Sequence, residues 1–224
     1  MGAWPRGVGL LGSSLHKEDP RVKLYQSTGA PNPRRVTVFL AEKGIEVELV
    51  EVSIAKGEHK LPEYLEKNPL GRVPVLELDD GSYLSETVAI CRYLEEETPE
   101  PPLFGVDGLD RARVEMWNRR MEFEIFGMFG GWFRNGHDFF KGRIPQVPEY
   151  GEVCRNALIS RMDWLDRELD GCEFIAGDRY TIADITAQCA FDFFGKILKQ
   201  MPTPDQKNLS RWYEGVSRRP SAKA

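Results

Sequence analysis

The sequence predicts two domains, an α/β domain with a mixed four-stranded sheet followed by an all-helical domain. Short β-rich runs alternate with helical runs from Val22 to Glu97, and only helical patterns follow after about residue 108. A chain of 224 residues with 41% hydrophobic residues can bury one sizeable core or two small ones. We therefore expect an α/β domain at 21–97, a linker at 98–108 and a helical domain at 109–224, with residues 1–20 as a flexible extension.

The first domain alternates strands and helices in a recognisable order. The expected elements are a strand in VKLYQ, a helix over PRRVTVFLAEKG, a strand within 46–52, a short helix near LPEYLEKN, strands at 73–78 and 82–84, and a helix over 86–97. Asp79-Asp80-Gly81 is typical of a hairpin turn, which makes the last two strands antiparallel. A helical crossover makes the first two strands parallel. The order β-α-β-α-β-β-α is a thioredoxin-like arrangement.

The remainder of the chain is predicted to be a linker followed by helices. Three prolines within the segment TPEPPLFG, which begins at Thr98, remove amide donors and forbid a helix there. Thr181 suits a helix N-cap, and Asp184 three residues later can return the hydrogen bond in a capping box, with Asp in place of the usual Glu. The other expected helices cover residues 109–135, 149–170 and 206–217.

Composition excludes several classes of partner. Thirty basic and 35 acidic residues give a formal charge of −5, which argues against general affinity for nucleic acid or anionic membranes. No apolar run reaches the length of about 18 residues that a membrane span needs, and residues 1–20 are too broken by glycine for a secretory signal. The four cysteines form no CxxC pair and no zinc-binding spacing. We therefore expect free thiols, no metal and a cytoplasmic location.

A set of motifs resembles the cytosolic glutathione S-transferases. The motifs are APNPRRV at 30–36, GEHK at 57–60, NPLGRVPVL at 68–76, the pair Glu86-Thr87 and the box TIADI at 181–185. Each motif is weak alone, but their order and spacing are strong evidence together and cover about residues 22–220. The similarity is greatest to bacterial members of the theta, phi and nu-like groups. It implies that glutathione is the co-substrate and that the protein is a homodimer.

The resemblance implies how two parts of glutathione are bound. A cis Val73–Pro74 bond would expose backbone groups that pair with the cysteine of glutathione, whereas the alternative is a trans proline at a strand start. Glu86 would bind the γ-glutamyl ammonium group, and Thr87 with the first amides of the following helix would bind the adjacent carboxylate. Alternatively, Ser85 or Thr87 merely caps that helix and Glu86 complements its dipole.

For the glycine carboxylate of glutathione, the resemblance implies His59, Lys60 and Arg72. Arg72 occupies a position where the family often has Gln or Lys, and it directly precedes Val73. A guanidinium group suits a carboxylate because it can donate two parallel hydrogen bonds. For His59, a solvated loop residue is an equally good interpretation.

Activation of the glutathione thiol is where the sequence departs from the family pattern. A free thiol has a pKa of about 8.5, so catalysis near neutral pH needs a group that stabilises the thiolate. Ala30 stands where theta and phi enzymes carry a catalytic serine, and no tyrosine or cysteine replaces it. Asn32 matches an asparagine that nu-like members place beside the sulfur, and Ser27 and Thr28 lie earlier in the same loop. Asn32-Pro33 also fits an N-cap followed by proline, so Asn32 could simply start its helix.

The site for the second substrate is expected to be apolar and to lie between the first domain and the long helix. Met116, Arg120, Phe123 and Trp132 are the candidates to line it, although an aromatic stripe at helical spacing is often plain core. The predicted activity is addition of the glutathione thiolate to small hydrophobic electrophiles, or its use to reduce a peroxide or disulfide. The alternatives are a non-catalytic glutathione-binding carrier or interaction protein, and a glutathione-dependent isomerase.

Overall fold

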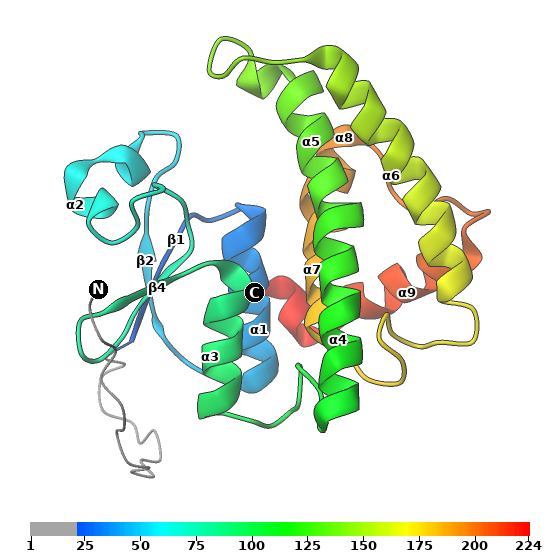
Figure 1. Cartoon of the computed structure of the whole chain (residues 1–224), viewed down its shortest axis with the longest axis horizontal. Helices are drawn as coiled ribbons and strands as arrows, with labels where there is room; N and C mark the ends of the chain where they lie inside the picture. The colour runs from blue at the N-terminus through cyan, green and yellow to red at the C-terminus, as the bar shows by residue number, and fades with distance from the viewer. Residues whose placement is uncertain (1–21) are drawn as a thin grey trace, which may run out of the picture.

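The computed structural model describes residues 22–224, which form a sheet-containing domain beside a helical domain (Figure 1). The extension expected at residues 1–20 lies outside the described residues. Within them, no helix is both long and apolar enough to cross a membrane. All four cysteines fall in this part of the chain and carry free thiols, as expected: Cys91, Cys154, Cys172 and Cys189.

The first domain contains the predicted mixed sheet. Its strands are β1 (Lys23–Gln26), β2 (Glu48–Glu51), β3 (Val75–Glu77) and β4 (Tyr83–Ser85), in the order β2-β1-β3-β4. Strand β1 pairs parallel to β2, and β3 pairs antiparallel to both β1 and β4. The predicted strand directions are therefore confirmed.

The two faces of this sheet are covered by different helices. Helices α1 (Pro31–Lys43) and α3 (Thr87–Glu97) lie between the sheet and the helical domain, and the short helix α2 (Pro62–Leu65) lies on the opposite side (Figure 1). Side chains alternate along a strand, so Leu76 joins the large core beneath α1 and α3 while Val75 joins a small core with Tyr64. The small core fixes the segment that leads into β3.

The second domain is built around a long rod. The rod consists of α4 (Gly108–Arg120), a π-helical turn η2 (Met121–Phe126) and α5 (Gly127–Gly136), and α6 (Pro148–Glu168) packs along α5 (Figure 1). Helix α7 (Ile182–Ala190) is buried at all of its positions between α1, α4 and the other helices. The remaining helical segments are η1 (Glu58–Lys60), η3 (Asp138–Phe140), η4 (Phe191–Gly195), α8 (Lys196–Leu198), α9 (Lys207–Ser217) and η5 (Pro220–Lys223).

One predicted helix start is wrong. Helix α1 begins at Pro31, with Ala30 as its N-cap and no side chain accepting a capping hydrogen bond, so Asn32 lies inside the first turn. The physical reason is that Pro31 itself supplies the fixed φ that favours the first helical position. Asn32 is therefore free of the capping role that its sequence position suggested.

Candidate functional site

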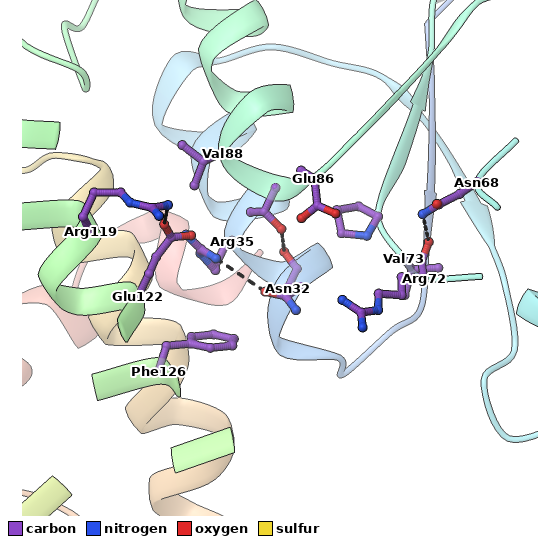
Figure 2. Close-up of a pocket in the computed structure, with 12 residues that line it drawn as sticks. Asn32, Arg35, Asn68, Arg72, Val73, Glu86, Val88, Arg119, Glu122 and Phe126 are labelled. Atoms are coloured by element: carbon purple, nitrogen blue, oxygen red, sulfur yellow. Dashed lines mark hydrogen bonds and ion pairs between the residues drawn. The ribbon is translucent and has the colours of Figure 1, made fainter. Parts of the chain in front are cut away.

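A cavity of about 370 Å³ lies between the two domains, and we refer to it as the interdomain cavity (Figure 2). Its walls come from the first turn of α1, the segment before β3, the first turn of α3, and the rod of the helical domain at α4 and η2. Its lining residues are Asn32, Arg35, Asn68, Arg72, Val73, Pro74, Glu86, Thr87, Val88, Arg119, Glu122 and Phe126. This volume lies in the range typical of small-molecule sites.

The backbone before β3 forms one wall of the cavity and is held from behind. The Val73–Pro74 peptide bond is cis, as predicted. The carbonyl oxygen of Arg72 accepts two hydrogen bonds, from the Tyr64 hydroxyl at 2.8 Å and from Asn68 Nδ2 at 2.9 Å. Both donor side chains are buried. The sequence interpretation overlooked Tyr64 and Asn68, although Asn68 is the first residue of the NPLGRVPVL motif.

Glu86 enters the cavity from an unusual backbone conformation. Its φ of 72° makes it one of only two non-glycine residues with positive φ in the described chain. It is the N-cap of α3, and no side chain caps that helix, so the interpretation of Ser85 or Thr87 as a cap is wrong. The Thr87 hydroxyl instead donates to the Asn32 carbonyl oxygen at 3.5 Å, which connects the first turns of α3 and α1.

The three residues predicted to bind the glycine carboxylate lie in different surroundings. Arg72 lines the cavity and makes no ion pair with any described residue. Lys60 Nζ donates to the carbonyl oxygens of Leu70 and Gly71, each at 3.3 Å. His59 does not line the cavity, and its pKa is lowered by burial and by the neighbouring charge of Lys60.

The three candidates for thiol activation lie on different elements, Ser27 and Thr28 in the loop before α1 and Asn32 in the first turn of α1. Thr28 donates its backbone N–H and its hydroxyl to Glu51, each at 2.9 Å, and the Ser27 hydroxyl donates to the same carboxylate at 3.5 Å. Neither residue lines the cavity, whereas Asn32 does. Asn32 Nδ2 makes no hydrogen bond to any described residue. Of the three, Asn32 therefore has a donor available on the cavity side.

The helical domain contributes charged residues and one aromatic ring to the cavity. Glu122 accepts hydrogen bonds from Arg35 at 2.9 Å and from Arg119 at 3.0 Å (Figure 2). The Arg35 guanidinium also lies over the Phe126 ring, 5.3 Å from its centroid. The sequence interpretation did not identify these residues. Each residue type is common in helices, and only a contact with a distant segment places its side chain at the cavity.

The predicted acceptor residues lie outside this cavity. Met116 and Phe123 are exposed, Arg120 stacks over Trp117 at 4.7 Å, and Trp132 lies beside Arg155. The residues that do line it are offset by about one position along the rod, and one helical position corresponds to a rotation of about 100°. An acceptor site on Met116, Arg120, Phe123 and Trp132 stays a prediction that this cavity does not support.

The cavity is suited to a short zwitterionic molecule. Glu86 and Arg72 line it as opposite charges that have no ion-pair partner in the described chain, whereas Arg35, Arg119 and Glu122 neutralise one another in part. Both side chains are exposed at the mouth of the cavity, so a ligand can reach their charges and form charge-assisted hydrogen bonds with them. Between these charges lie the Val73 backbone and the Asn32 side-chain amide, both able to hydrogen bond with the middle of such a ligand.

Comparison with known proteins gives matches over nearly the whole chain. Residues 20–96 match the family "Glutathione S-transferase, N-terminal domain", and residues 139–220 match "Glutathione S-transferase, C-terminal domain". A relative named glutathione S-transferase 2, from Saccharomyces cerevisiae, is 34% identical, with 96% of this chain and 93% of the relative covered.

The chain is also similar to a solved structure and to a relative with a different name. The crystal structure of a glutathione S-transferase domain-containing protein from Marinobacter aquaeolei superimposes with a TM-score of 0.85 at 36% identity, covering 89% of this chain and 98% of that one. Elongation factor 1-gamma 2 from Oryza sativa subsp. japonica is 28% identical over 89% of this chain, and this chain spans 47% of that relative.

Proposed function

The chain belongs to the glutathione S-transferase family, and from that premise we propose that it is a glutathione transferase that adds the glutathione thiolate to small hydrophobic electrophiles. The observation that carries this proposal is the interdomain cavity, with its unpaired Glu86 and Arg72 and the free amide of Asn32. Glutathione is a tripeptide with an ammonium group and a carboxylate at one end, a second carboxylate at the other, and a thiol between them. Its charges complement those of the cavity.

Each part of glutathione has a proposed partner. Glu86 accepts hydrogen bonds from the γ-glutamyl ammonium group, and the free N–H groups in the first turn of α3, beginning at Thr87, receive the adjacent carboxylate. The Val73 backbone pairs with the cysteine residue, and Arg72 binds the glycine carboxylate. The two donors that hold the Arg72 carbonyl oxygen keep this segment in place before the ligand arrives.

We assign thiolate stabilisation to Asn32. The first turn of α1 contains prolines at 31 and 33, which have no N–H, and the Arg34 N–H bonds within the helix, so the Asn32 N–H is the free backbone donor of that turn. Asn32 Nδ2 adds a second donor. Hydrogen bonds to the charged form of an acid lower its pKa. The thiol proton leaves to water, and the sulfur then forms a bond to the electrophilic carbon of the acceptor as that carbon releases its leaving group.

A carrier that binds glutathione without activating it is the second candidate. It is favoured by Ala30, which leaves the usual position of the catalytic hydroxyl empty. Both candidates require the same contacts to Glu86, Thr87 and Arg72. They differ only in the state of the bound thiol.

The deciding experiment follows the ultraviolet absorbance of the bound thiolate as the pH is varied. A transferase is expected to keep the thiolate well below the ordinary thiol pKa of about 8.5. Turnover of a chloronitrobenzene acceptor should fall roughly 100-fold in Asn32→Ala, because a donor to the anion is lost. Ser27→Ala and Thr28→Ala are matched controls in the loop that precedes α1, and they should keep the low thiol pKa because their hydroxyls donate to Glu51.

Two results would contradict the proposal. An unshifted titration of bound glutathione in the unaltered protein would identify a carrier. A low thiol pKa that survives Asn32→Ala but is lost in Ser27→Ala or Thr28→Ala would move thiolate stabilisation to the upstream hydroxyls.

A further inference from the structure

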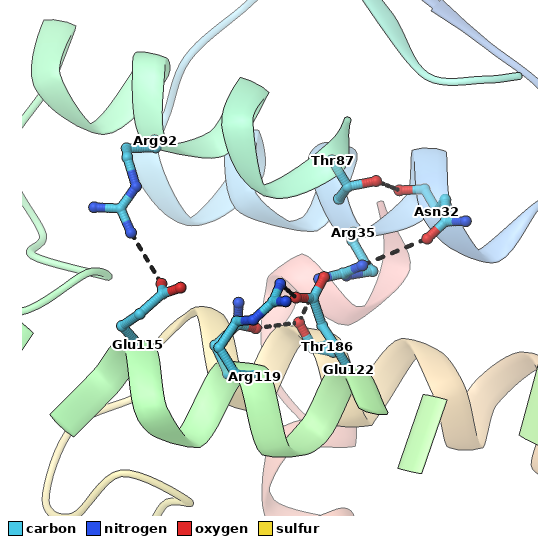
Figure 3. A network of polar contacts seen from close by, with 9 residues as sticks. Asn32, Arg35, Thr87, Arg92, Glu115, Arg119, Glu122 and Thr186 are labelled. Carbon is cyan, nitrogen blue, oxygen red and sulfur yellow. Dashed lines mark hydrogen bonds and ion pairs between the residues drawn. The ribbon is translucent and has the colours of Figure 1, made fainter. Parts of the chain in front are cut away.

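Arg35 is a buried cation at the boundary between the domains and at the wall of the interdomain cavity. The residue is only 3% exposed. One terminal nitrogen, Nη2, donates to Glu122 at 2.9 Å and to the Thr186 hydroxyl at 2.8 Å, so two helices of the second domain fix the guanidinium (Figure 3). The Thr186 hydroxyl in turn donates to Asn118 Oδ1 at 2.7 Å.

The other terminal nitrogen of Arg35 is directed at Asn32. Arg35 Nη1 donates to Asn32 Oδ1 at 3.4 Å, across one turn of helix α1 (Figures 2 and 3). A side-chain amide has an oxygen that accepts and a nitrogen that donates. Because Arg35 can only donate, it selects the orientation in which Oδ1 faces Arg35 and Nδ2 remains for the cavity.

We propose that Arg35 is a positioning residue for thiol activation, which holds the Asn32 amide with its Nδ2 donor facing the glutathione sulfur. This inference rests on the proposed function, because it assumes that Asn32 stabilises the thiolate. A hydrogen bond to Oδ1 from a cation also polarises the amide and strengthens the hydrogen bond that Nδ2 donates. The second domain thus acts on the chemistry of the first through Glu122, Thr186 and Arg35.

The planar fork of arginine is essential to this arrangement. Arg35 donates hydrogen bonds to Glu122 and Thr186 from one nitrogen and to Asn32 from the other. Lysine carries a compact charge on a flexible stem and cannot hold the two sets of acceptors in one plane. Arg35→Lys therefore keeps the buried cation beside Glu122 but loses the orientation of Asn32.

Arg34 offers a matched control on the same helix. It also joins the two domains, through an ion pair with Asp192 at 2.6 Å and a hydrogen bond to the Ala222 carbonyl oxygen at 2.9 Å, but it does not line the cavity. Loss of either arginine removes one interdomain ion pair. Only loss of Arg35 also removes the hydrogen bond to Asn32 Oδ1.

The test measures the pKa of bound glutathione, with kcat and KM, in Arg35→Met, Arg35→Lys and Arg34→Met. We expect the bound-thiol pKa to rise by about 1 unit in both Arg35 variants, kcat to fall roughly 10-fold and KM for glutathione to change less than about 3-fold. Arg34→Met should lower the unfolding temperature without moving the thiol pKa. If Arg35→Met does not fold, Arg35→Lys decides alone, because it retains the buried charge.

Asn32→Ala provides the background that separates positioning from direct electrostatics. The other charged groups at the cavity are Arg72, Glu86, Arg119 and Glu122, and the charge of Arg35 could act on the sulfur through space. If Arg35 acts through Asn32, Arg35→Lys should change the thiol pKa by less than about 0.3 units when Asn32 is already Ala. An equal shift in both backgrounds, or a bound-thiol pKa in Arg35→Lys that stays as low as in the unaltered protein when Asn32 is intact, would overturn the inference while leaving the proposed function intact. An unshifted thiol in the unaltered protein would overturn both.

Discussion

Glu86 has a backbone conformation that its own side chain disfavours. With φ at 72° and ψ at 119°, it occupies a region that glycine enters readily and other residues enter at a cost of about 1–3 kcal/mol. Its carboxylate accepts no capping hydrogen bond and forms no ion pair within the described chain. The backbone strain is therefore not offset by any contact of the side chain within the described residues, and it is better explained by ligand binding at the cavity wall than by stability.

Changes at Glu86 should therefore separate binding from folding. Glu86→Gln is expected to weaken glutathione binding roughly 10-fold to 100-fold, because a charge-assisted hydrogen bond is worth about 1.5–3 kcal/mol. Glu86→Gly should weaken binding at least as much but raise the free energy of unfolding, since glycine removes the backbone cost. Titration calorimetry and urea denaturation measure the two effects.

The control for Glu86 is Glu63→Gln, an exposed glutamate on α2 that does not line the cavity. It should leave glutathione affinity unchanged. Unaltered affinity in Glu86→Gln itself would mean that Glu86 does no more than complement the dipole of α3.

The sequence motifs contain most of the residues that line the first-domain side of the cavity, but they do not reveal how these residues are held. Glu86, Arg72 and Asn32 stand at motif positions and could be proposed from the sequence. Arg35 and Asn68 lie within the same motifs, yet their partners are Glu122 and the Arg72 backbone. A contact between residues 87 positions apart leaves no signal in a single sequence, because neither residue type is unusual in its own helix.

At the scale of the element, the start of helix α7 depends on a single buried carboxylate. Asp184 accepts hydrogen bonds from the backbone N–H and hydroxyl of Thr181, which confirms the predicted capping box. Its other oxygen accepts from the Ile175 N–H at 2.9 Å and from Trp212 Nε1 at 2.8 Å. The carboxylate thus joins α7 to the preceding loop and to α9, which the sequence did not indicate.

The pH dependence of stability should report on Asp184. Burial raises the pKa of its carboxyl group to about 6, from an ordinary value of 3.8, despite the hydrogen bonds that oppose the shift. The folded protein therefore binds a proton that the unfolded chain has released, and the contribution of Asp184 to stability falls as the pH rises from about 4 to about 6. A shift of this size corresponds to about 3 kcal/mol.

Asp184→Asn isolates that contribution, because the amide does not titrate. The difference in free energy of unfolding between the unaltered protein and Asp184→Asn should shrink as the pH rises through this window, measured by urea denaturation. The variant should be less stable at every pH, since all four partners are donors and the amide nitrogen cannot accept from them. A constant difference between pH 4 and about 7 would show that Asp184 is ionised throughout.

Other elements show what local sequence patterns can and cannot predict. The strands and their directions follow from alternation and from the Asp79-Asp80-Gly81 turn, and these were predictable. The π-helical turns η2 and η4 were not, because each needs one extra residue per turn that only packing against neighbouring helices can specify. The turn η2 brings Glu122 and Phe126 to the cavity, so the face of the rod that reaches the ligand could not be read from a regular helical period.

At the scale of the whole molecule, helix α1 is tied to the end of the chain. Glu42 accepts two hydrogen bonds from Arg219, at 2.8 and 2.7 Å, and Arg34 binds Asp192 and the Ala222 carbonyl oxygen. Figure 1 shows the C-terminus beside α1 at the boundary between the domains. The sequence predicts the two folds separately, whereas their relative placement depends on these long-range pairs. The interdomain cavity is therefore a property of the assembled chain.

The long rod carries an exposed apolar stripe that points to a partner. Leu109, Met116 and Phe123 are 62%, 41% and 55% exposed. Leu109 and Met116 are seven residues apart on α4, and seven α-helical residues rotate by about 700°, so these two lie nearly in line, while Phe123 is exposed on the π-helical turn η2 that continues α4. A row of large apolar side chains in water is unfavourable and commonly marks an interface.

We expect this stripe to bury against a second copy of the chain in a two-fold dimer, as the family resemblance implies. Sedimentation at micromolar concentration should give about twice the chain mass of 25.5 kDa. Because charges buried without partners are strongly unfavourable, combining Met116→Glu with Phe123→Glu should shift the protein to monomer. Val153→Glu, at a position 62% exposed on α6, is the matched control and should leave the dimer intact. A monomer before any substitution would refute the dimer, and a dimer that survives the double change would place its interface on another surface.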